Sequence, residues 1–224
     1  MINGLIVSCQ AIEGEILHAY NIMDLMALAA EAGGAKGIRA NGARDIKAIK
    51  ARVDLPVIGL VKAHYGDCNV FITPTLKEVK ELCEAGVDCL AMDATFRKRP
   101  NGEKLEDLVA FVRKNYPQIE LFADTARVEE AIEAEKLGFD YVSTTLCSYT
   151  EDTKGIKIPN LDVIDEYVSK IKKSKIVVEG GIWEVGQLKA ILAHGIDTVV
   201  IGTAITRPMD ITKRFAACFG DEKK

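Results

Sequence analysis

A lysine and a glutamate each end a strongly apolar run, and together they could move a proton. Lys62 follows Pro-Val-Ile-Gly-Leu-Val, and Glu179 follows Ile-Val-Val. A free lysine is almost fully protonated at neutral pH, but burial can lower its pKa by several units. Lys62 could then serve as a general base or a Schiff-base nucleophile, with Glu179 donating or accepting a proton. The alternative is structural: Lys62 would pair with Asp93 or Glu179, and Glu179 with Lys62 or Arg39.

Residues after the last two apolar runs could bind a phosphate. Backbone N–H groups that no bulky side chain shields occur at Gly180, Gly181, Gly202 and Thr203. Such groups hold an anion when a helix begins beside them, and a helix start near Pro208 would add a favourable dipole. Arg207 could clamp the anion through two hydrogen bonds. The alternatives are tight-turn geometry for the glycines and capping of a neighbouring acid by Arg207.

Polar side chains end seven of eight apolar runs in the chain, and they carry charges of both signs. They are Ser8, Gln10, Arg39, Lys62, Asp93, Asp124, Thr144, Thr145 and Glu179. A single polar residue at a strand end is usually just solvated. In a (β/α)8 barrel, however, all eight strand ends meet at one mouth, where active sites are built. The set therefore predicts a polar pocket with a charged floor.

An internal repeat in the sequence supports a fold of eight βα units. Glycines at 34, 86, 138 and 195 follow a helical pattern and precede an apolar strand, at spacings of 52, 52 and 57 residues. A single βα unit is about half that long, so each period should hold two units. The apolar runs are continuous rather than alternating, as in a parallel sheet covered on both faces. A doubly wound sheet would need a Gly-x-Gly-x-x-Gly turn after an early strand, and none follows the first run.

These patterns predict an α/β fold: a single (β/α)8 (TIM) barrel over residues 1–224, with a phosphate site after strands seven and eight. The predicted strands are Leu5–Gln10, Gly37–Ala40, Val57–Lys62, Cys89–Ala94, Glu120–Asp124, Tyr141–Leu146, Ile176–Gly180 and Thr198–Thr203. The predicted helices are Asn21–Ala32, Arg44–Val53, Leu76–Ala85, Lys104–Asn115, Val128–Leu137, Leu161–Lys172, Trp183–His194 and Asp210–Phe219. Thr75 and Asp162 are predicted N-caps, and Pro208 a helix start.

Composition argues against several classes of protein. The chain has 29 basic and 33 acidic residues, a net charge of −4, and no apolar run long enough to span a membrane. We therefore expect no nucleic-acid partner and no membrane partner. The N-terminus lacks the pattern of a signal peptide, so cytoplasmic residence is expected. The six cysteines form no C-x-x-C pair and are predicted to be reduced and mostly buried; with three histidines they do not favour a zinc cluster.

Other features are assigned plainer roles. The basic run at 97–99 is predicted to be a solvated loop, although it could gate an anionic substrate. Trp183 is predicted to pack at a helix start. A nucleophilic cysteine would need a nearby histidine, and only His64 is placed to serve Cys9 or Cys147. The final helix could pack on its own barrel or seal a dimer.

Several motifs occur in the order found in one family. They are Leu5-Ile-Val-Ser-Cys-Gln10, Gly37-Ile-Arg-Ala-Asn-Gly42, Phe71-Ile-Thr-Pro-Thr-Leu-Lys-Glu-Val79, Asp93-Ala-Thr95, Leu137-Gly-Phe-Asp-Tyr141, Thr144-Thr-Leu146, Ala204-Ile-Thr-Arg-Pro208 and Thr212-Lys-Arg-Phe215. Over almost its whole length the chain resembles the N-acetylmannosamine-6-phosphate 2-epimerase family. The Ser-Cys-Gln, Ile-Arg-Ala and Ala-Ile-Thr-Arg-Pro motifs together carry the specificity of the match.

The resemblance implies an N-acylglucosamine-6-phosphate 2-epimerase. Such an enzyme inverts carbon 2 of N-acetylmannosamine 6-phosphate in sialic-acid catabolism, without a metal or organic cofactor. By the resemblance, Lys62 and Glu179 match the acid/base pair. The family's substrate-binding residues match Gln10, Arg39, Asp124 and Arg207. A small-molecule sugar phosphate is the implied substrate, and a homodimer is one expected state.

The chain departs from the family pattern beside the site. The family commonly has arginine directly after its lysine, where this chain has Ala63. Thr125 to Arg127 and Cys147 also differ from the common residues. These changes bear on substrate preference more than on reaction type. Two other functions stay open: a different sugar-phosphate isomerase or decarboxylase, and a sugar-phosphate sensor without catalysis.

Overall fold

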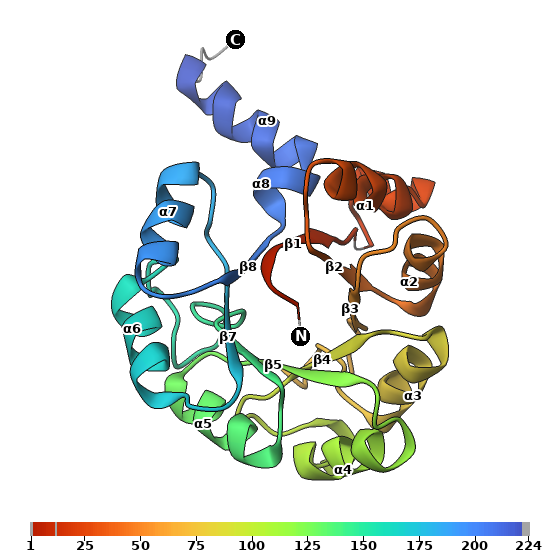
Figure 1. Cartoon of the computed structure of the whole chain (residues 1–224). Coiled ribbons are helices and arrows are strands. Elements are labelled where there is room, and N and C mark those ends of the chain that lie inside the picture. The colour runs from red at the N-terminus through yellow and green to blue at the C-terminus, as the bar shows by residue number, and fades with distance from the viewer. Residues whose placement is uncertain (1, 12, 221–224) are drawn as a thin grey trace.

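The structure, a computed structural model, describes residues 2–11 and 13–220 and contains a closed barrel of eight parallel strands. Each strand pairs with its neighbours in chain order, and β8 closes on β1 (Figure 1). The strands are β1 Gly4–Cys9, β2 Gly37–Asn41, β3 Val57–Leu60, β4 Cys89–Asp93, β5 Glu120–Asp124, β6 Tyr141–Ser143, β7 Lys175–Glu179 and β8 Thr198–Ile201. The predicted (β/α)8 barrel is confirmed.

Helices surround the strands on the outside (Figure 1). They are α1 Met23–Ala32, α2 Ala43–Lys50, α3 Leu76–Ala85, α4 Leu105–Asn115, α5 Val128–Leu137, α6 Leu161–Lys170, α7 Val185–Ala193, α8 Thr203–Thr206 and α9 Pro208–Ala216. The described residues also contain short stretches of 3₁₀ helix, which are η1 Ile16–Tyr20, η2 Pro100–Gly102 and η3 Ala217–Phe219. The predicted strand Thr198–Thr203 was too long, because α8 begins at Thr203 and ends the extended backbone.

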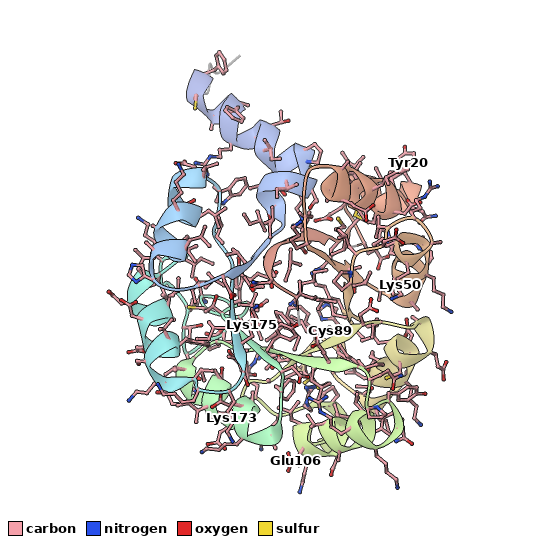
Figure 2. All side chains as sticks on the ribbon, in the orientation of Figure 1. Tyr20, Lys50, Cys89, Glu106, Lys173 and Lys175 are labelled. Atoms are coloured by element: carbon pink, nitrogen blue, oxygen red, sulfur yellow. The ribbon has the colours of Figure 1, made fainter. Side chains whose placement is uncertain are left out.

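Apolar side chains fill two layers, one inside the ring of strands and one between strands and helices. Cys89 lies inside the ring, whereas Glu106 lies at the outer rim (Figure 2). Phe122 and Tyr141 stack inside the barrel with ring centroids 5.7 Å apart. In the outer layer, Gly59 permits close packing, since a Cβ there would lie 2.3 Å from Cγ1 of Val87. The continuous apolar runs therefore reflect burial on both faces.

Local signals set most helix ends. Thr75 caps α3 through a capping box with Glu78, as predicted. Gly86 and Gly138 end α3 and α5 with φ values of 79° and 90°, a conformation that favours glycine. The predicted cap at Asp162 is wrong: Asn160 caps α6 by accepting the backbone N–H of Val163, two residues earlier than expected.

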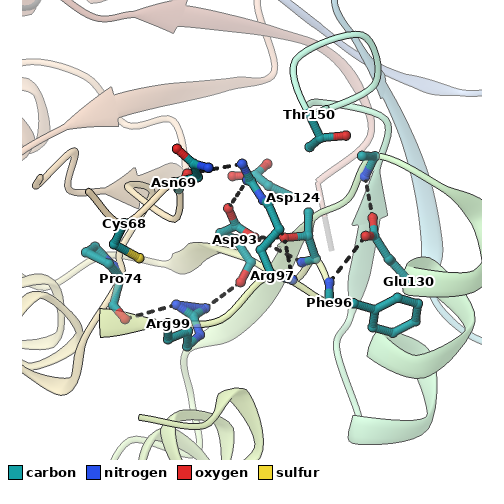
Figure 3. A network of polar contacts seen from close by, with 12 residues as sticks. Cys68, Asn69, Pro74, Asp93, Phe96, Arg97, Arg99, Asp124, Glu130 and Thr150 are labelled. Atoms are coloured by element: carbon teal, nitrogen blue, oxygen red, sulfur yellow. Dashed lines mark hydrogen bonds and ion pairs between the residues drawn. The ribbon is translucent and has the colours of Figure 1, made fainter. Parts of the chain in front are cut away.

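Two residues of the basic run at 97–99, Arg97 and Arg99, fold onto the end of β4, which corrects their prediction as part of a solvated loop, while Lys98 is exposed as predicted (Figure 3). Arg97 forms an ion pair with Asp93 at 2.5 Å. Arg99 is buried and donates to the carbonyl oxygens of Pro74 and Asp93. The loop that follows β4 thus supplies an arginine for the Asp93 carboxylate and another for the Asp93 carbonyl oxygen. The carboxylate at the end of β4 therefore has a structural role.

Helix α9 projects away from the barrel (Figure 1). None of its residues is buried; Phe215 in α9 is 67% exposed, and Phe219 in the following η3 is 86% exposed. Among residues 2–11 and 13–220, no helix combines the length and the apolar character needed to cross a membrane.

Candidate active site

A cavity of about 640 Å³ opens at the carboxyl ends of the strands. Strand-end residues from β1, β7 and β8 contribute to its wall, together with residues that follow β3, β6 and β8. The predicted site residues that line it are Gln10, Lys62, Glu179, Gly180, Gly181, Gly202, Thr203 and Arg207. The barrel therefore brings together both predicted proton carriers and all four predicted phosphate-binding residues.

Lys62 lies two residues beyond the end of β3. Its backbone N–H donates to Oδ1 of Asn41 at 2.9 Å, and a bridge to Ile72 holds the same residue from the other side. Burial lowers the pKa of the Lys62 ammonium, and the positive charges of Arg39 and Arg207 lower it further. Within the described part of the chain, Lys62 forms no ion pair, since Asp93 pairs with Arg97 and Glu179 with Arg39. The structural alternative for Lys62 is therefore not what the fold adopts.

Glu179 ends β7 with its side chain 17% exposed. Its Oε2 accepts a hydrogen bond from Oγ1 of Thr145 at 2.8 Å and lies 3.3 Å from Nη1 of Arg39. Burial raises the pKa of Glu179 above its ordinary value, and the charge of Asp124 adds to the rise, while Arg39 opposes it. Glu179 is thus a partner of Arg39, as its structural alternative required, and it also faces the cavity.

Arg39 and Asp124 form a buried ion pair under the cavity floor. Their atoms Nη2 and Oδ2 lie 2.7 Å apart, and the side chains are 1% and 0% exposed. Burial acts to lower the pKa of Arg39, but the carboxylates of Asp124 and Glu179 outweigh it, so the guanidinium stays charged. Arg39 on β2 lies beside Ile58 on β3, and Ile58 comes four residues before Lys62. Arg39 therefore lies deeper in the barrel than Lys62. Neither side chain lines the cavity, so their direct contact with substrate stays a prediction.

The glycine corner combines special backbone with open N–H groups. Gly180 and Gly181 have φ values of 111° and 70°, which favour glycine. A Cβ on Gly181 would lie 2.3 Å from the carbonyl oxygen of Ile158. Gly202 precedes the short helix α8. Tight geometry therefore explains the glycines in part, and the same residues line the cavity where an anion would reach their amides.

Arg207 stands at the cavity edge and pairs with Glu15 at 3.0 Å. Its predicted alternative, a cap on a neighbouring acid, is thus present in this structure. The guanidinium is 29% exposed. Arg207 therefore lies where it can reach a ligand in the cavity.

An apolar wall of the cavity was not predicted. It includes Phe71, Tyr149, Ile158 and Trp183. Trp183 was expected to pack at a helix start; it lines the cavity and lies under the guanidinium of Arg214, 5.1 Å from its ring centroid. Phe71 opens the Phe-Ile-Thr-Pro-Thr motif, which was a usable signal. Tyr149 and Ile158 belong to a long segment between β6 and α6 without helical periodicity, so no pattern pointed to them.

Cysteine chemistry is disfavoured. Burial raises the pKa of the Cys9 thiol to about 12 and also raises that of Cys147. His64, the histidine proposed to serve them, stacks on Phe71 with ring centroids 5.4 Å apart. Over the described ranges, no three His, Cys, Asp or Glu side chains gather as a metal site would require.

Comparison with known proteins places this geometry in a family. Residues 23–221 match the family model described as N-acetylmannosamine-6-phosphate epimerase. A protein of Borrelia garinii subsp. bavariensis named as an N-acetylmannosamine-6-phosphate 2-epimerase is 50% identical over 223 residues, covering 99% of this chain and 96% of the relative. One from Listeria monocytogenes serovar 1/2a, with the same name, is 50% identical and covers 95% and 90%.

A solved structure shows the same arrangement. The N-acetylmannosamine-6-phosphate 2-epimerase from Clostridium perfringens superposes with a TM-score of 0.91 at 46% identity, covering 96% of this chain and 93% of that one. The chain belongs to the N-acetylmannosamine-6-phosphate epimerase family.

Proposed function

We propose that this protein inverts carbon 2 of N-acetylmannosamine 6-phosphate to give N-acetylglucosamine 6-phosphate, as an N-acylglucosamine-6-phosphate 2-epimerase in sialic-acid catabolism. The supporting observation is the placement of Lys62 and Glu179 in one cavity with pKa values displaced toward each other, one lowered and one raised. Displaced pKa values of this kind are typical of groups that exchange protons at neutral pH.

The chemistry follows from the acidity of the sugar. In the open-chain form, the hydrogen on carbon 2 lies next to the carbonyl at carbon 1 and is the only readily acidic C–H. Neutral Lys62 removes that proton, and protonated Glu179 returns one to the opposite face; the two exchange roles in the reverse direction. Removal of the proton leaves an enolate-like oxygen that needs stabilisation. The charge of Arg39 beneath the floor and the polar end of Gln10 supply it.

The substrate phosphate is assigned to the glycine corner. Gly180 and Gly181 follow β7, and Gly202 and Thr203 follow β8, and all four line the cavity, which supports a site in which their N–H groups bind one anion. Arg207 exchanges Glu15 for the phosphate when the sugar binds. The phosphate thereby fixes carbon 2 between the two proton carriers.

The direct test is proton exchange at carbon 2. The protein is mixed with N-acetylmannosamine 6-phosphate in deuterated water, and carbon 2 is followed by ¹H NMR. We expect loss of the carbon 2 proton signal together with appearance of the gluco epimer. Absence of both changes with folded protein would refute the proposal.

Variants assign the chemistry to the two residues. Lys62→Ala and Glu179→Ala should each lower kcat by about 10²-fold or more, the range for loss of a general acid or base. Lys136→Ala and Glu133→Ala are matched controls, because these side chains are 65% and 52% exposed on α5 and far from the cavity. Wild-type turnover by Lys62→Ala would remove the lysine from the mechanism.

We also propose that the protein works as a homodimer. Helix α9 has no buried residue and exposes Phe215, and a largely apolar groove of about 510 Å³ lies between α9 and the segment around Ile16. A second copy would cover both surfaces. Sedimentation equilibrium should give twice the chain mass, and Phe215→Ser should shift it toward the monomer; a wild-type monomer at assay concentration would contradict this state.

A further inference from the structure

The two carboxylate oxygens of Glu179 stand in different environments. Oε2 accepts from Oγ1 of Thr145 at 2.8 Å and lies 3.3 Å from Nη1 of Arg39. Within the described ranges, no protein group forms a hydrogen bond with Oε1. One oxygen is thus anchored to the protein, and the other is free to face the cavity that Glu179 lines.

The anchor is a chain of two hydroxyl groups. Oγ of Ser143 lies 2.5 Å from Oγ1 of Thr145, and the backbone N–H of Thr145 donates to the same Ser143 oxygen at 3.2 Å. Each hydroxyl has one hydrogen to donate. Because Thr145 gives its hydrogen to Glu179, Ser143 must donate to Thr145. The chain therefore runs in one direction, from Ser143 through Thr145 to the carboxylate, and each bond polarises the next.

Arg39 alone cannot determine which carboxylate oxygen of Glu179 is anchored and which faces the cavity. Its nearer contact is Asp124 at 2.7 Å, while its approach to Glu179 is 3.3 Å. The guanidinium therefore fixes the charge balance beneath the cavity, and the shorter, directional bond to Glu179 comes from Thr145. Thr144, the neighbour of Thr145, bonds only to the backbone N–H and carbonyl of Glu179, so it does not touch the carboxylate.

We propose that Thr145 is a positioning residue for the proton transfer: its hydroxyl holds Oε2 of Glu179, so that Oε1 is the oxygen that carries the exchanged proton. The proton moves between carbon 2 of the sugar and Oε1, while the electron pair of the C–H bond passes to or from the enolate-like intermediate. This role rests on the proposed epimerase function, although the anchoring itself can be measured without substrate.

The charges that face Glu179 determine the direction of the pH effect. They come from Arg39 on β2, Asp124 on β5 and Lys62 after β3. The Thr145 hydrogen bond favours the ionised carboxylate and so acts to lower the pKa of Glu179 against burial. Loss of the hydroxyl should raise that pKa, whereas a change in packing alone should leave it in place.

The first measurement compares Thr145→Val with Thr145→Ser in the carbon 2 exchange assay. Valine has the same shape but no hydroxyl, and serine restores the hydroxyl. Thr145→Val should lower kcat by about 10- to 100-fold, the loss expected for a hydrogen bond to a charged group, with KM changed less than about threefold. Thr145→Ser should stay within about threefold of wild type. Equal losses in both variants would show a packing role and overturn the proposal.

The second measurement is a carboxyl-¹³C NMR titration of Glu179 without substrate, with Glu179→Gln used to assign the resonance. The midpoint should be higher in Thr145→Val than in wild type, and unchanged in the control Thr144→Val. An unshifted midpoint in Thr145→Val overturns the anchoring. A wild-type protein that anchors Glu179 in this way but exchanges no proton at carbon 2 would overturn the epimerase function instead, so the two failures are distinct.

Discussion

Removing the charge of Asp124 tests the ion pair on which the floor of the cavity rests. Asp124 and Arg39 are 0% and 1% exposed, and their contact is 2.7 Å. Asp124→Asn would leave the guanidinium buried with only Glu179 at 3.3 Å to balance it. Loss of one partner of a buried pair costs about 3–5 kcal/mol. Because asparagine keeps an oxygen acceptor and Glu179 remains, we expect the low end, about 3 kcal/mol of unfolding free energy.

Urea denaturation followed by circular dichroism measures this loss of unfolding free energy directly. For a chain of this length, a loss of about 3 kcal/mol corresponds to a fall of about 6–12 °C in Tm. Glu133→Gln is the matched control: its ion pair with Lys136 is exposed, so its removal should change stability by less than about 1 kcal/mol. The Arg39→Met/Asp124→Leu double variant should be more stable than Asp124→Asn, because the buried guanidinium is removed together with its partner and Glu179, whose pKa is already raised, can take up a proton when Arg39 is lost.

The reasoning fails if Asp124→Asn loses less than about 1 kcal/mol, the value of an exposed pair. Such a result would mean that water or a rearranged Glu179 takes over the guanidinium at little cost. A double variant less stable than the single one would show that the pair is favourable in itself, contrary to the expectation for buried pairs.

Three further predictions concern the cavity. Lys62→Arg should lower kcat by about 10²- to 10⁴-fold, since arginine keeps its proton and cannot act as a base; steady-state kinetics checks this. The raised pKa of folded Glu179 favours its protonated form, a contribution that is full below the ordinary pKa and lost as pH rises through the folded pKa. Glu179→Gln should therefore be more stable than wild type in urea at pH 8, with the difference shrinking as pH falls through the raised pKa of folded Glu179 and vanishing below 4.5. Gly181→Ala should lose about 1–3 kcal/mol in the same assay, because its Cβ would meet the carbonyl oxygen of Ile158. Gly186→Ala in α7, where a Cβ meets open space, should be neutral or stabilising.

The strands were predictable because parallel strands in a barrel are covered on both faces and so read as continuous apolar runs. The helices were predictable because their ends carry caps such as Thr75 and Gly86. Helix α8, Thr203–Thr206, was missed because four residues are too few to show helical periodicity. The end of β6 was placed three residues too late, at Leu146 instead of Ser143, because the β-branched Thr144 and Thr145 and the apolar Leu146 also suit a strand.

For the site, the rule that strand ends meet at one mouth brought Lys62 and Glu179 together. The rule did not predict how deep in the barrel each side chain lies. Arg39 also follows an apolar strand, yet its register with Ile58 places it a layer below Lys62. The ion pair at Asp93 depends on a loop that returns to its own strand end, and such loop paths leave no periodic trace in the sequence. The apolar wall that includes Trp183 was missed for the same reason.

The opposite pKa displacements of Lys62 and Glu179 have a consequence for the empty enzyme. At their ordinary values of 10.5 and 4.5, the arrangement with charged lysine and charged glutamate would be favoured over the neutral one by about 8 kcal/mol. The lowered lysine and the raised glutamate narrow that gap. Under the proposed transfer, each turnover leaves the site in the arrangement opposite to the one it started from. The protonation states of Lys62 and Glu179 in the free enzyme then depend on which epimer was released last. At high substrate concentration, the proton exchange that restores the starting protonation states becomes a step that limits turnover.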